Sequence, residues 1–529
     1  MHGVEAFELV LALLALIVAL HWAALKLRLP PSTALLVGGG ALAFTPGLPA
    51  FALDPDLVLV LFLPPLLMDG AYSTAHGRFK RFLPGILSLA AGAVVFTTLI
   101  VGVVVHWMVP ELPWAACFAL GAIVSPPDAV SARAVLQGVK LPRRVTALLE
   151  GESLLNDATG LILFRFAVAA TLSGAFSLGE AVQSFVIVAV GGAAVGLAVG
   201  FAWVFAIKRM GDRTLVVVTT ALLGWAAYLA GEAVHVSGVI STVVAGLVLG
   251  WHQHTVFSAS VRLLGNSFWH VLTFVLETMV FILIGFSLRG VVERMGGEAI
   301  LGPLVLVVLA VVATVVVARF VWVFGSDWLL AALHGAGLKR ARPLGWRQAT
   351  VVGWAGMRGV VTLAVPLTLP LETPGRDLML LCAFAVIFAT VVLQGSTLGW
   401  IIRTARPIDE EPPPKMLLPA AEAAMARARL ARIEKLAYAE DGTLIHPMML
   451  EEQRKRMGFM ERYEREPAAA MEKLRPHFDV LIAALSSGRA ELIRLHRTGM
   501  IEDEVLQELE RDIDVEEMGM MFQRGDTES

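Results

Sequence analysis

Apolar segments about as long as a bilayer is thick follow one another from residue 5 to residue 402. A transmembrane helix needs roughly 20 apolar residues, and within lipid only helices and closed barrels satisfy all their backbone hydrogen bonds. The mean hydropathy is +0.72, and 16% of the residues are charged, against about 25% in a soluble domain. We therefore predict an all-α polytopic membrane protein.

The apolar pattern predicts thirteen transmembrane spans. They cover residues 5–26, 32–49, 55–75, 83–108, 113–136, 147–173, 179–207, 214–232, 236–252, 264–288, 301–333, 347–370 and 377–402. The first is expected to be a retained span, because its apolar run is longer than the core of a signal peptide and no basic segment precedes it.

Basic residues gather in the loops that follow odd-numbered spans, which predicts the orientation of the chain. Examples are Lys26 and Arg28, Arg78, Lys80 and Arg81, Lys140, Arg143 and Arg144, Lys208, Arg209 and Arg213, Arg262, and Lys339, Arg340 and Arg342. Loops after even-numbered spans carry mostly acids, such as Asp54, Asp56, Glu111, Glu180, Glu232, Glu293 and Glu298. Because cytoplasmic loops are rich in Lys and Arg, we expect a cell (inner or plasma) membrane protein with its N-terminus outside and its C-terminus in the cytoplasm.

Two spans are interrupted, and they lie seven apart in the series. Span 5 contains Ser125-Pro126-Pro127-Asp128, and span 12 contains a glycine-rich stretch around Arg358. This spacing fits an inverted repeat of spans 1–6 and 8–13, in which paired broken helices indicate a transport site. Proline and glycine are also simply common in membrane helices. We favour the transport reading, because each break also carries a charge.

The chain after the last span differs in composition and predicts a second domain. We assign residues 1–406 to the membrane domain and residues 407–416, which include three consecutive prolines, to a linker. Residues 417–529 are acidic overall, with helical stretches around 417–439, 448–465, 468–486 and 489–516. We interpret this region as a cytoplasmic helical domain for regulation or dimer contact; a solvated structural extension is the alternative.

The most informative residues lie in span 6, which contains Glu152, Ser153, Asn156 and Asp157. An ionisable group inside a membrane is costly unless it is paired or neutralised, and is by default a functional candidate. Ser153 lies one helical turn before Asp157 on the same face, so the two side chains can offer a carboxylate and a hydroxyl to one cation. Such a carboxylate can hold a cation or a proton, but not both well. That competition is the chemistry of ion exchange.

Groups at the first break and in span 3 extend the candidate site. The Pro126-Pro127 step removes backbone donors and leaves carbonyl oxygens, which together with Asp128 suit a hard cation such as sodium. Asn156 cannot carry charge, but its amide can hydrogen-bond to the interrupted helix. Asp69 either lines the ion pathway or lies at a loop edge.

The remaining charges inside spans need partners. Arg358 requires a counter-charge, for which Glu152 and Glu277 are the candidates; we favour a structural ion pair over ion coordination. Snorkelling or pairing at a helix end is our reading of Arg165 and Arg319. Three histidines, His252, His254 and His270, could sense pH, although ordinary interfacial positions are the favoured reading.

At these residues the chain resembles the monovalent cation/proton antiporter family, which includes NhaP-type bacterial proteins and the animal sodium/proton exchangers. The matching motifs are Leu-Pro-Pro-Leu-Leu-Met-Asp at 63–69, Ser-Pro-Pro-Asp-Ala-Val at 125–130, Gly-Glu-Ser-Leu-Leu-Asn-Asp at 151–157, Glu-Thr-Met-Val-Phe-Ile-Leu-Ile-Gly at 277–285 and Gly-Met-Arg-Gly at 356–359. The resemblance implies thirteen helices, a homodimer, two crossed interrupted helices and an elevator-like movement of a core domain.

The resemblance also implies roles for single residues. Asp157 matches the aspartate that carries sodium or a proton, Ser153 a ligand position, and Asn156 the asparagine of electroneutral members. The family pattern makes Glu152 and Arg358 a structural pair and Asp128 the acid at the first break. The family often has a threonine where this chain has Pro127, whose side chain offers no hydroxyl, so only its carbonyl could serve the ion.

We therefore expect exchange of sodium or lithium for protons, electroneutral, with membrane lipid and a second copy of the chain as partners. Potassium/proton exchange, a gated cation channel and a membrane sensor that signals through its tail are the alternatives. Cys117 and Cys382 lie in apolar spans and predict neither a disulfide framework nor a zinc site. We expect no cofactor, no nucleic-acid partner and no enzymatic activity.

Overall fold

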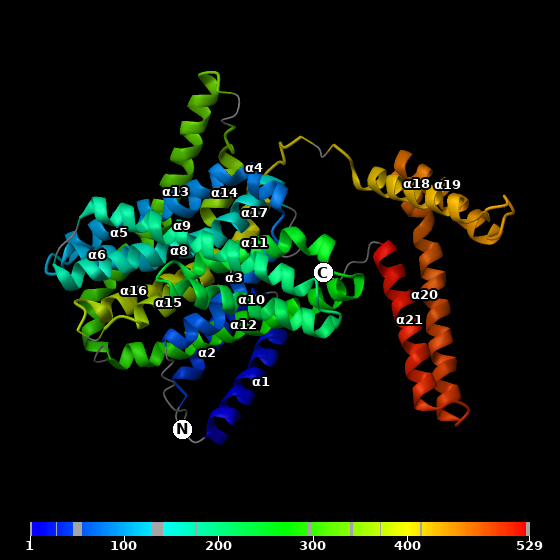
Figure 1. The fold of residues 1–529 in the computed structure, drawn as a ribbon. Helices are drawn as coiled ribbons and strands as arrows, with labels where there is room; N and C mark the ends of the chain where they lie inside the picture. The colour runs from blue at the N-terminus through cyan, green and yellow to red at the C-terminus, as the bar shows by residue number, and fades with distance from the viewer. Residues whose placement is uncertain are drawn as a thin grey trace. The chain divides into compact units, whose positions relative to one another are not determined.

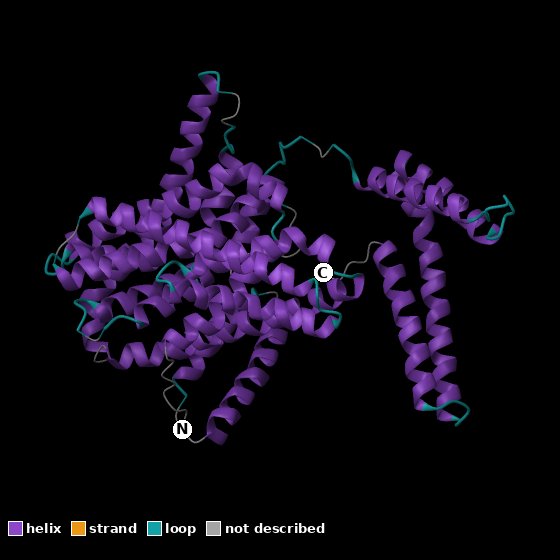
Figure 2. Ribbon diagram, viewed as in Figure 1, coloured by secondary structure: helices purple, strands orange, loops and turns teal. Residues whose placement is uncertain are grey.

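The computed structural model describes residues 3–27, 29–45, 55–128, 141–174, 177–294, 298–338, 342–370, 372–412 and 415–524. Its regular elements are helices (Figures 1 and 2), with an isolated β-bridge between Tyr438 and Leu444. Packing divides the chain into two units, Met1–Glu410 and Glu411–Ser529. This division falls within residues 407–416.

The first unit contains the helices that correspond to the predicted spans. They are α1 (Gly3–Leu27), α2 (Pro31–Ala43), α3 (Pro55–Ser73), α4 (His76–Leu87), α5 (Val94–Met108), α6 (Trp114–Val124), α8 (Arg143–Ser173), α9 (Leu178–Ile207), α10 (Arg213–Ala233), α11 (Gly238–Val256), α12 (Ala259–Arg294), α13 (Glu298–Gly335), α14 (Trp346–Trp354), α15 (Val360–Leu367), α16 (Arg376–Ala389) and α17 (Gly395–Ala405). Two π-helical turns, η1 (Ser88–Ala93) and η2 (Thr390–Gln394), join α4 to α5 and α16 to α17.

The predicted all-α membrane fold is confirmed. Seven described helices are each long and apolar enough to cross a membrane, and shorter apolar helices accompany them. A helix lies on each of the thirteen predicted spans, and spans 5 and 12 are interrupted after Val124 and after Trp354. Residues 46–49 of span 2, residues 129–136 of span 5, and Arg28, Asp54, Lys140, Lys339 and Arg340 lie outside the described residues.

The helices of the first unit pack in two groups. One, the core group, comprises α4, α5, α6, α8 and α13–α17; the other, the flanking group, comprises α1–α3 and α9–α12. Contacts between the groups run mainly from α8 and α15 to α3, from α8 to α11, and from α12 to α15 and α16. Each half of the predicted repeat thus gives its first three spans to the flanking group and its last three to the core group, as an inverted repeat predicts.

Glycine allows close packing inside the flanking group. A Cβ atom at Gly39 of α2 would lie 2.5 Å from the carbonyl oxygen of Ile282, and one at Gly285 of α12 would lie 2.5 Å from that of Leu36. The two backbones can therefore touch only because both residues lack a side chain, as small residues allow at membrane helix interfaces.

The second unit consists of α18 (Leu418–Leu436), α19 (Pro447–Arg465), α20 (Pro467–Arg497) and α21 (Asp503–Arg524). The sequence placed a break near residue 487, but α20 runs on through Gly488. A glycine in an exposed helix costs only about 1 kcal/mol, so it did not end this one. The helix ends instead before Gly499, which has φ +71°, and the Met500 N–H donates to the Leu495 carbonyl, as in a glycine C-cap.

Candidate ion-binding site where two helix breaks meet

The interruptions of spans 5 and 12 touch each other through their backbones. The Asp128 N–H donates to the Met357 carbonyl at 2.6 Å, although the two residues lie in opposite halves of the predicted repeat. A Cβ atom at Gly359 would overlap the Asp128 carboxylate. The approach of the two breaks therefore depends on a glycine at this position, and it brings Asp128 beside the start of α15.

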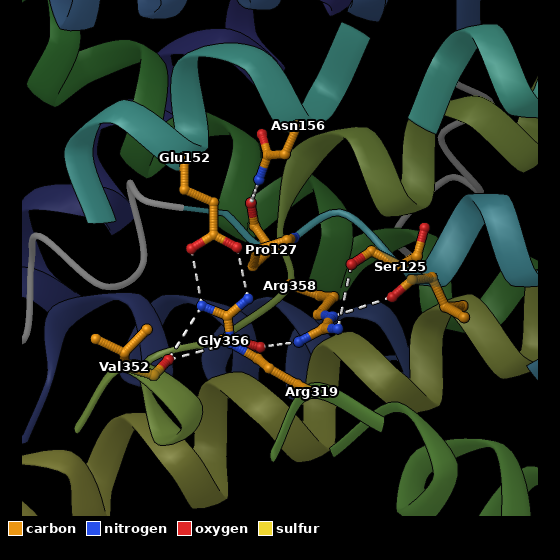
Figure 3. Close-up of polar contacts among 9 residues, drawn as sticks. Ser125, Pro127, Glu152, Asn156, Arg319, Val352, Gly356 and Arg358 are labelled. Carbon is orange, nitrogen blue, oxygen red and sulfur yellow. Dashed lines mark hydrogen bonds and ion pairs between the residues drawn. The ribbon is translucent and has the colours of Figure 1, made fainter. Parts of the chain in front are cut away.

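Arg358 donates hydrogen bonds to carbonyl groups at the end of the first broken helix, α6 (Figure 3). Its guanidinium donates to the carbonyls of Val124 at 3.0 Å and Ser125 at 3.2 Å, and also to the Gly356 carbonyl. Its backbone N–H donates to the Thr390 hydroxyl at 3.0 Å. The last carbonyls of a helix lack intrahelical partners and carry the negative end of the helix dipole. Arg358 is thus held by carbonyls at the end of α6.

Glu152 pairs with Arg319, not with the expected Arg358. Arg319 Nη1 and Nη2 bind the two carboxylate oxygens of Glu152 at 2.6 and 2.9 Å (Figure 3). The same guanidinium donates to the Val352 carbonyl near the end of α14 at 3.2 and 3.1 Å. Arg319 was expected to snorkel or to pair at a helix end: it does not snorkel, because its side chain is buried, and it pairs from the middle of α13. At each break, an arginine therefore donates hydrogen bonds to carbonyls at the helix end: Arg358 at the end of α6 and Arg319 near the end of α14.

Asp157 faces a cavity next to the crossing. The cavity has a volume of about 40 Å³, where a water molecule needs roughly 10–15 Å³. Besides Asp157, the acidic and hydroxyl side chains that line it are those of Asp128, Glu150, Ser153, Glu277 and Thr362. Three of the predicted ion-binding residues, Asp157, Ser153 and Asp128, thus share one space that can hold a partly hydrated cation.

Asn156 lies on the side of α8 that meets the first break. Its amide nitrogen donates to the Pro127 carbonyl (Figure 3). A second, smaller cavity of about 10 Å³ is lined by Pro127, Asp128, Glu152, Ser153 and Asn156, among others. A carbonyl oxygen has two lone pairs, so Pro127 can accept this bond and keep one lone pair. The amide therefore ties α8 to the broken helix without adding charge.

The other residues singled out in the sequence lie further from the crossing. Asp69 lies on α3 beside Gly70, which lines the larger cavity. Arg165 pairs with Glu232 near the end of α10. Of the histidines, His252 contacts the Val248 carbonyl of its own helix at 2.8 Å, whereas His254 and His270 are exposed. A pH-sensing role for these histidines stays a prediction.

Sequence reasoning missed two cavity residues, Glu150 and Thr362, and misjudged Arg319, which lies outside the cavity lining. Glu150 lies two helical turns before Asp157, and this spacing on one face of α8 could have identified it. Thr362 lies in the first turn of α15, directly after the break, and lines the larger cavity. Arg319 lies far from both ends of the long apolar helix α13, too deep to reach the membrane surface, and that depth was the available signal.

Two comparisons place the chain among known proteins. A family model for "Sodium/hydrogen exchanger, transmembrane" matches residues 10–404. Among solved structures, the sodium proton antiporter MjNhaP1 of Methanocaldococcus jannaschii matches with a TM-score of 0.60 and 21% identity, over 77% of this chain and 99% of that one. At this identity the structural match supports the fold alone.

Relatives found by sequence similarity support the same family. A sodium, potassium, lithium and rubidium/H⁺ antiporter of Bacillus pumilus is 33% identical over 408 residues, which is 74% of this chain but 60% of the relative's length. A Mycobacterium bovis protein named as an uncharacterised Na⁺/H⁺ exchanger is 30% identical over 516 residues, 94% of this chain and 93% of its own. From the extent of these matches, we conclude that the chain belongs to the sodium/hydrogen exchanger family, a family of transporters.

Proposed function

We propose that the protein exchanges sodium, or lithium, for protons across the cell membrane, and that Asp157 carries each ion in turn. The observation that supports this most is the shared cavity of Asp157, Ser153 and Asp128 at the crossing of two broken helices. Broken helices at membrane depth are where transporters of this kind bind their ions. The chemistry of the lining, carboxylate and hydroxyl oxygens, suits a small hard cation.

In this proposal a cation and a proton compete for one carboxylate. With sodium bound, Asp157 is neutralised by the ion, and Ser153 supplies a further oxygen. Without sodium, a carboxylate in this surrounding is best neutralised by a proton. The site then changes the side to which it is open in either loaded form, and an unneutralised charge would make the same movement costly.

Electroneutral exchange follows from Asn156. The residue before Asp157 carries an amide, which donates to the Pro127 carbonyl; an amide has no group that titrates, so it cannot take up a second proton. One proton would then leave for each monovalent cation that binds, and no net charge would cross the membrane. The other acids of the cavity, Asp128, Glu150 and Glu277, keep the same ionisation through the cycle in this account.

The two helix groups suggest how the site could change sides. The core group carries both breaks and Asp157, and it meets the flanking group along few helices. We propose that the core group moves like an elevator against the flanking group, and that the flanking group supports a homodimer. The N-terminus would lie outside and the C-terminus in the cytoplasm, where residues 417–529 would form a regulatory domain.

Potassium is the second candidate cation. It is favoured by Pro127, which removes the threonine hydroxyl that many members place beside the ion, and by the printed name of the Bacillus pumilus relative, which includes potassium. A site with fewer fixed oxygens demands less dehydration of the ion and would tolerate a larger one.

Purified full-length protein in proteoliposomes with a trapped pH dye would test the proposal. Pulses of sodium, lithium and potassium chloride should each be compared with choline chloride, with the voltage clamped or free. We expect proton movement with sodium or lithium at equal rates under both voltage conditions. A current during exchange would contradict electroneutrality. Cation flux without proton movement would favour the channel reading, and no flux at all would favour the sensor.

A further inference from the structure

An ion pair joins α8 to the turn between α10 and α11 of the flanking group. Arg165 Nη2 lies 3.2 and 3.1 Å from the two carboxylate oxygens of Glu232, near the end of α10. The same carboxylate accepts from the Gly238 N–H, at the start of α11, at 3.4 Å. One glutamate thus connects the site-bearing helix with the α10–α11 turn.

This contact crosses between the two helix groups. Arg165 belongs to the core group, whereas Glu232 and Gly238 belong to the flanking group. Another polar contact across the groups, from the Thr33 hydroxyl to the Val391 carbonyl at 3.1 Å, involves no charge. A charged contact between groups that move against each other must break, because even a shift of a few ångströms exceeds hydrogen-bond reach.

The pair lies on the opposite side of Asp157 from the cavity. Along α8, the cavity residues Glu150 and Ser153 precede Asp157, whereas Arg165 follows it by eight residues, or about 12 Å at 1.5 Å per residue. The cavity therefore extends toward the beginning of α8, and the pair lies on the other side of Asp157. In the proposed orientation, the cavity is on the cytoplasmic side and the pair on the outer side.

The exposure of the pair fits a contact that opens and closes. The side chains of Arg165 and Glu232 are 55% and 34% exposed. In the proposed orientation Glu232, at the end of α10, lies at the outer surface; ion pairs in contact with water contribute little and are screened by salt, so the loss of this one should shift a two-state equilibrium by only about two- to fivefold. That is enough to bias the two states of a transporter without locking it in one of them.

We propose that Arg165 and Glu232 form an outer latch that stabilises the state in which the Asp157 cavity is open toward the beginning of α8. The latch would separate when the core group carries Asp157 toward the other side. This inference rests on the alternating movement in the proposed function, and it adds the residues that set the balance between the two states.

The test uses full-length protein with Leu66→Cys as a reporter, because Leu66 lines the cavity. The native Cys117 and Cys382 are buried and should give little background labelling. In this background, Arg165→Gln and Glu232→Gln should each slow labelling from the cavity side, by up to about fivefold. The exchanged pair Arg165→Glu with Glu232→Arg should restore it.

The matched control is Glu111→Gln, which removes an exposed acid from a loop of the core group and should leave labelling unchanged. Raising ionic strength with choline chloride should slow labelling of the Leu66→Cys protein toward the rate of the Arg165→Gln variant, and should not affect that variant. Equal labelling in all variants would overturn the latch, as would an equal change in the control.

Transport gives a second readout. If the latch exists, Glu232→Gln should raise the half-saturating sodium concentration on the cavity side and lower it on the other side; a purely structural defect would move both in one direction. Labelling needs no transport, so the latch can be upheld or rejected even if sodium/proton exchange is not the protein's activity. Labelling that changes while no cation moves protons would reject the proposed function alone.

Discussion

Two of the ion pairs that the structure describes on the long helix α8 differ in burial and in what they connect. Glu152 and Arg319 have side chains that are 2% and 3% exposed, and both belong to the core group. Arg165 and Glu232 are half to one-third exposed and connect the core group to the flanking group. We interpret the first pair as a fixed joint beside the proposed ion site and the second as the proposed latch. Position and burial, more than residue type, decide which role a charged pair can take.

The largest effect is expected from Arg319→Gln. It would leave the Glu152 carboxylate buried without its charge partner, and breaking such a pair costs about 3–5 kcal/mol. The free energy of unfolding of the purified protein in detergent should fall by that amount.

The double variant Glu152→Gln with Arg319→Gln is the control. It removes both charges and should recover part of the loss, because the buried uncompensated charge is gone. A single variant that unfolds like the unmodified protein would show that the pair is not a fixed joint.

A smaller effect is expected from Arg358→Lys. A lysine keeps the positive charge but lacks the guanidinium fork, so it cannot serve the carbonyls of Val124, Ser125 and Gly356 together. Each buried carbonyl left without a donor costs about 1–3 kcal/mol. Both stability and the rate of exchange should fall. Full exchange with lysine would mean that charge alone is required there.

Gly359→Ala should weaken sodium binding more than it lowers the stability of the fold. Its Cβ would overlap the Asp128 carboxylate, and overpacking of this kind costs about 1–3 kcal/mol. We expect the half-saturating sodium concentration to rise about tenfold if some 1.4 kcal/mol of that cost falls on the bound state.

Gly325→Ala is the matched control, since a Cβ on that helical glycine meets no atom within 4 Å. Sodium dependence should be unchanged in this variant. If both substitutions raise the half-saturating concentration equally, the contact between Gly359 and Asp128 does not shape the site.

The smallest effect on stability is expected from Arg165→Gln. An exposed pair contributes about 0.2–1 kcal/mol, so the free energy of unfolding should change by no more than that. This places the variant in direct contrast with Arg319→Gln in the same assay. A loss comparable to that of Arg319→Gln would remove the distinction between the two pairs.

Much of the fold could be predicted from the sequence, because lipid permits few solutions. Apolar runs of sufficient length had to be helices, and the breaks at Ser125-Pro126-Pro127-Asp128 and around Arg358 stood out by their prolines, glycines and charges. Local signals did not indicate the π-helical turns at Ser88–Ala93 and Thr390–Gln394, which insert an extra residue into a turn without a sequence mark of their own.

Pairings across the site were harder to predict. Glu152 and Arg319 lie 167 residues apart, and nothing local to either residue indicates the partner. Arg358 was expected to need a carboxylate, but the end of a broken helix already presents several carbonyl oxygens with partial negative charge. Those oxygens satisfied Arg358, which left Glu152 to the other buried arginine.

The most direct test of the account is proton movement driven by cation pulses in proteoliposomes that contain Asp157→Asn, beside the unmodified protein and Glu111→Gln. The account predicts exchange in the unmodified protein and in Glu111→Gln, and none in Asp157→Asn. In the unmodified protein, the half-saturating sodium concentration should rise by up to about tenfold for each unit that the pH falls, since one proton competes with one cation for the same carboxylate. Undiminished exchange by Asp157→Asn would contradict the account.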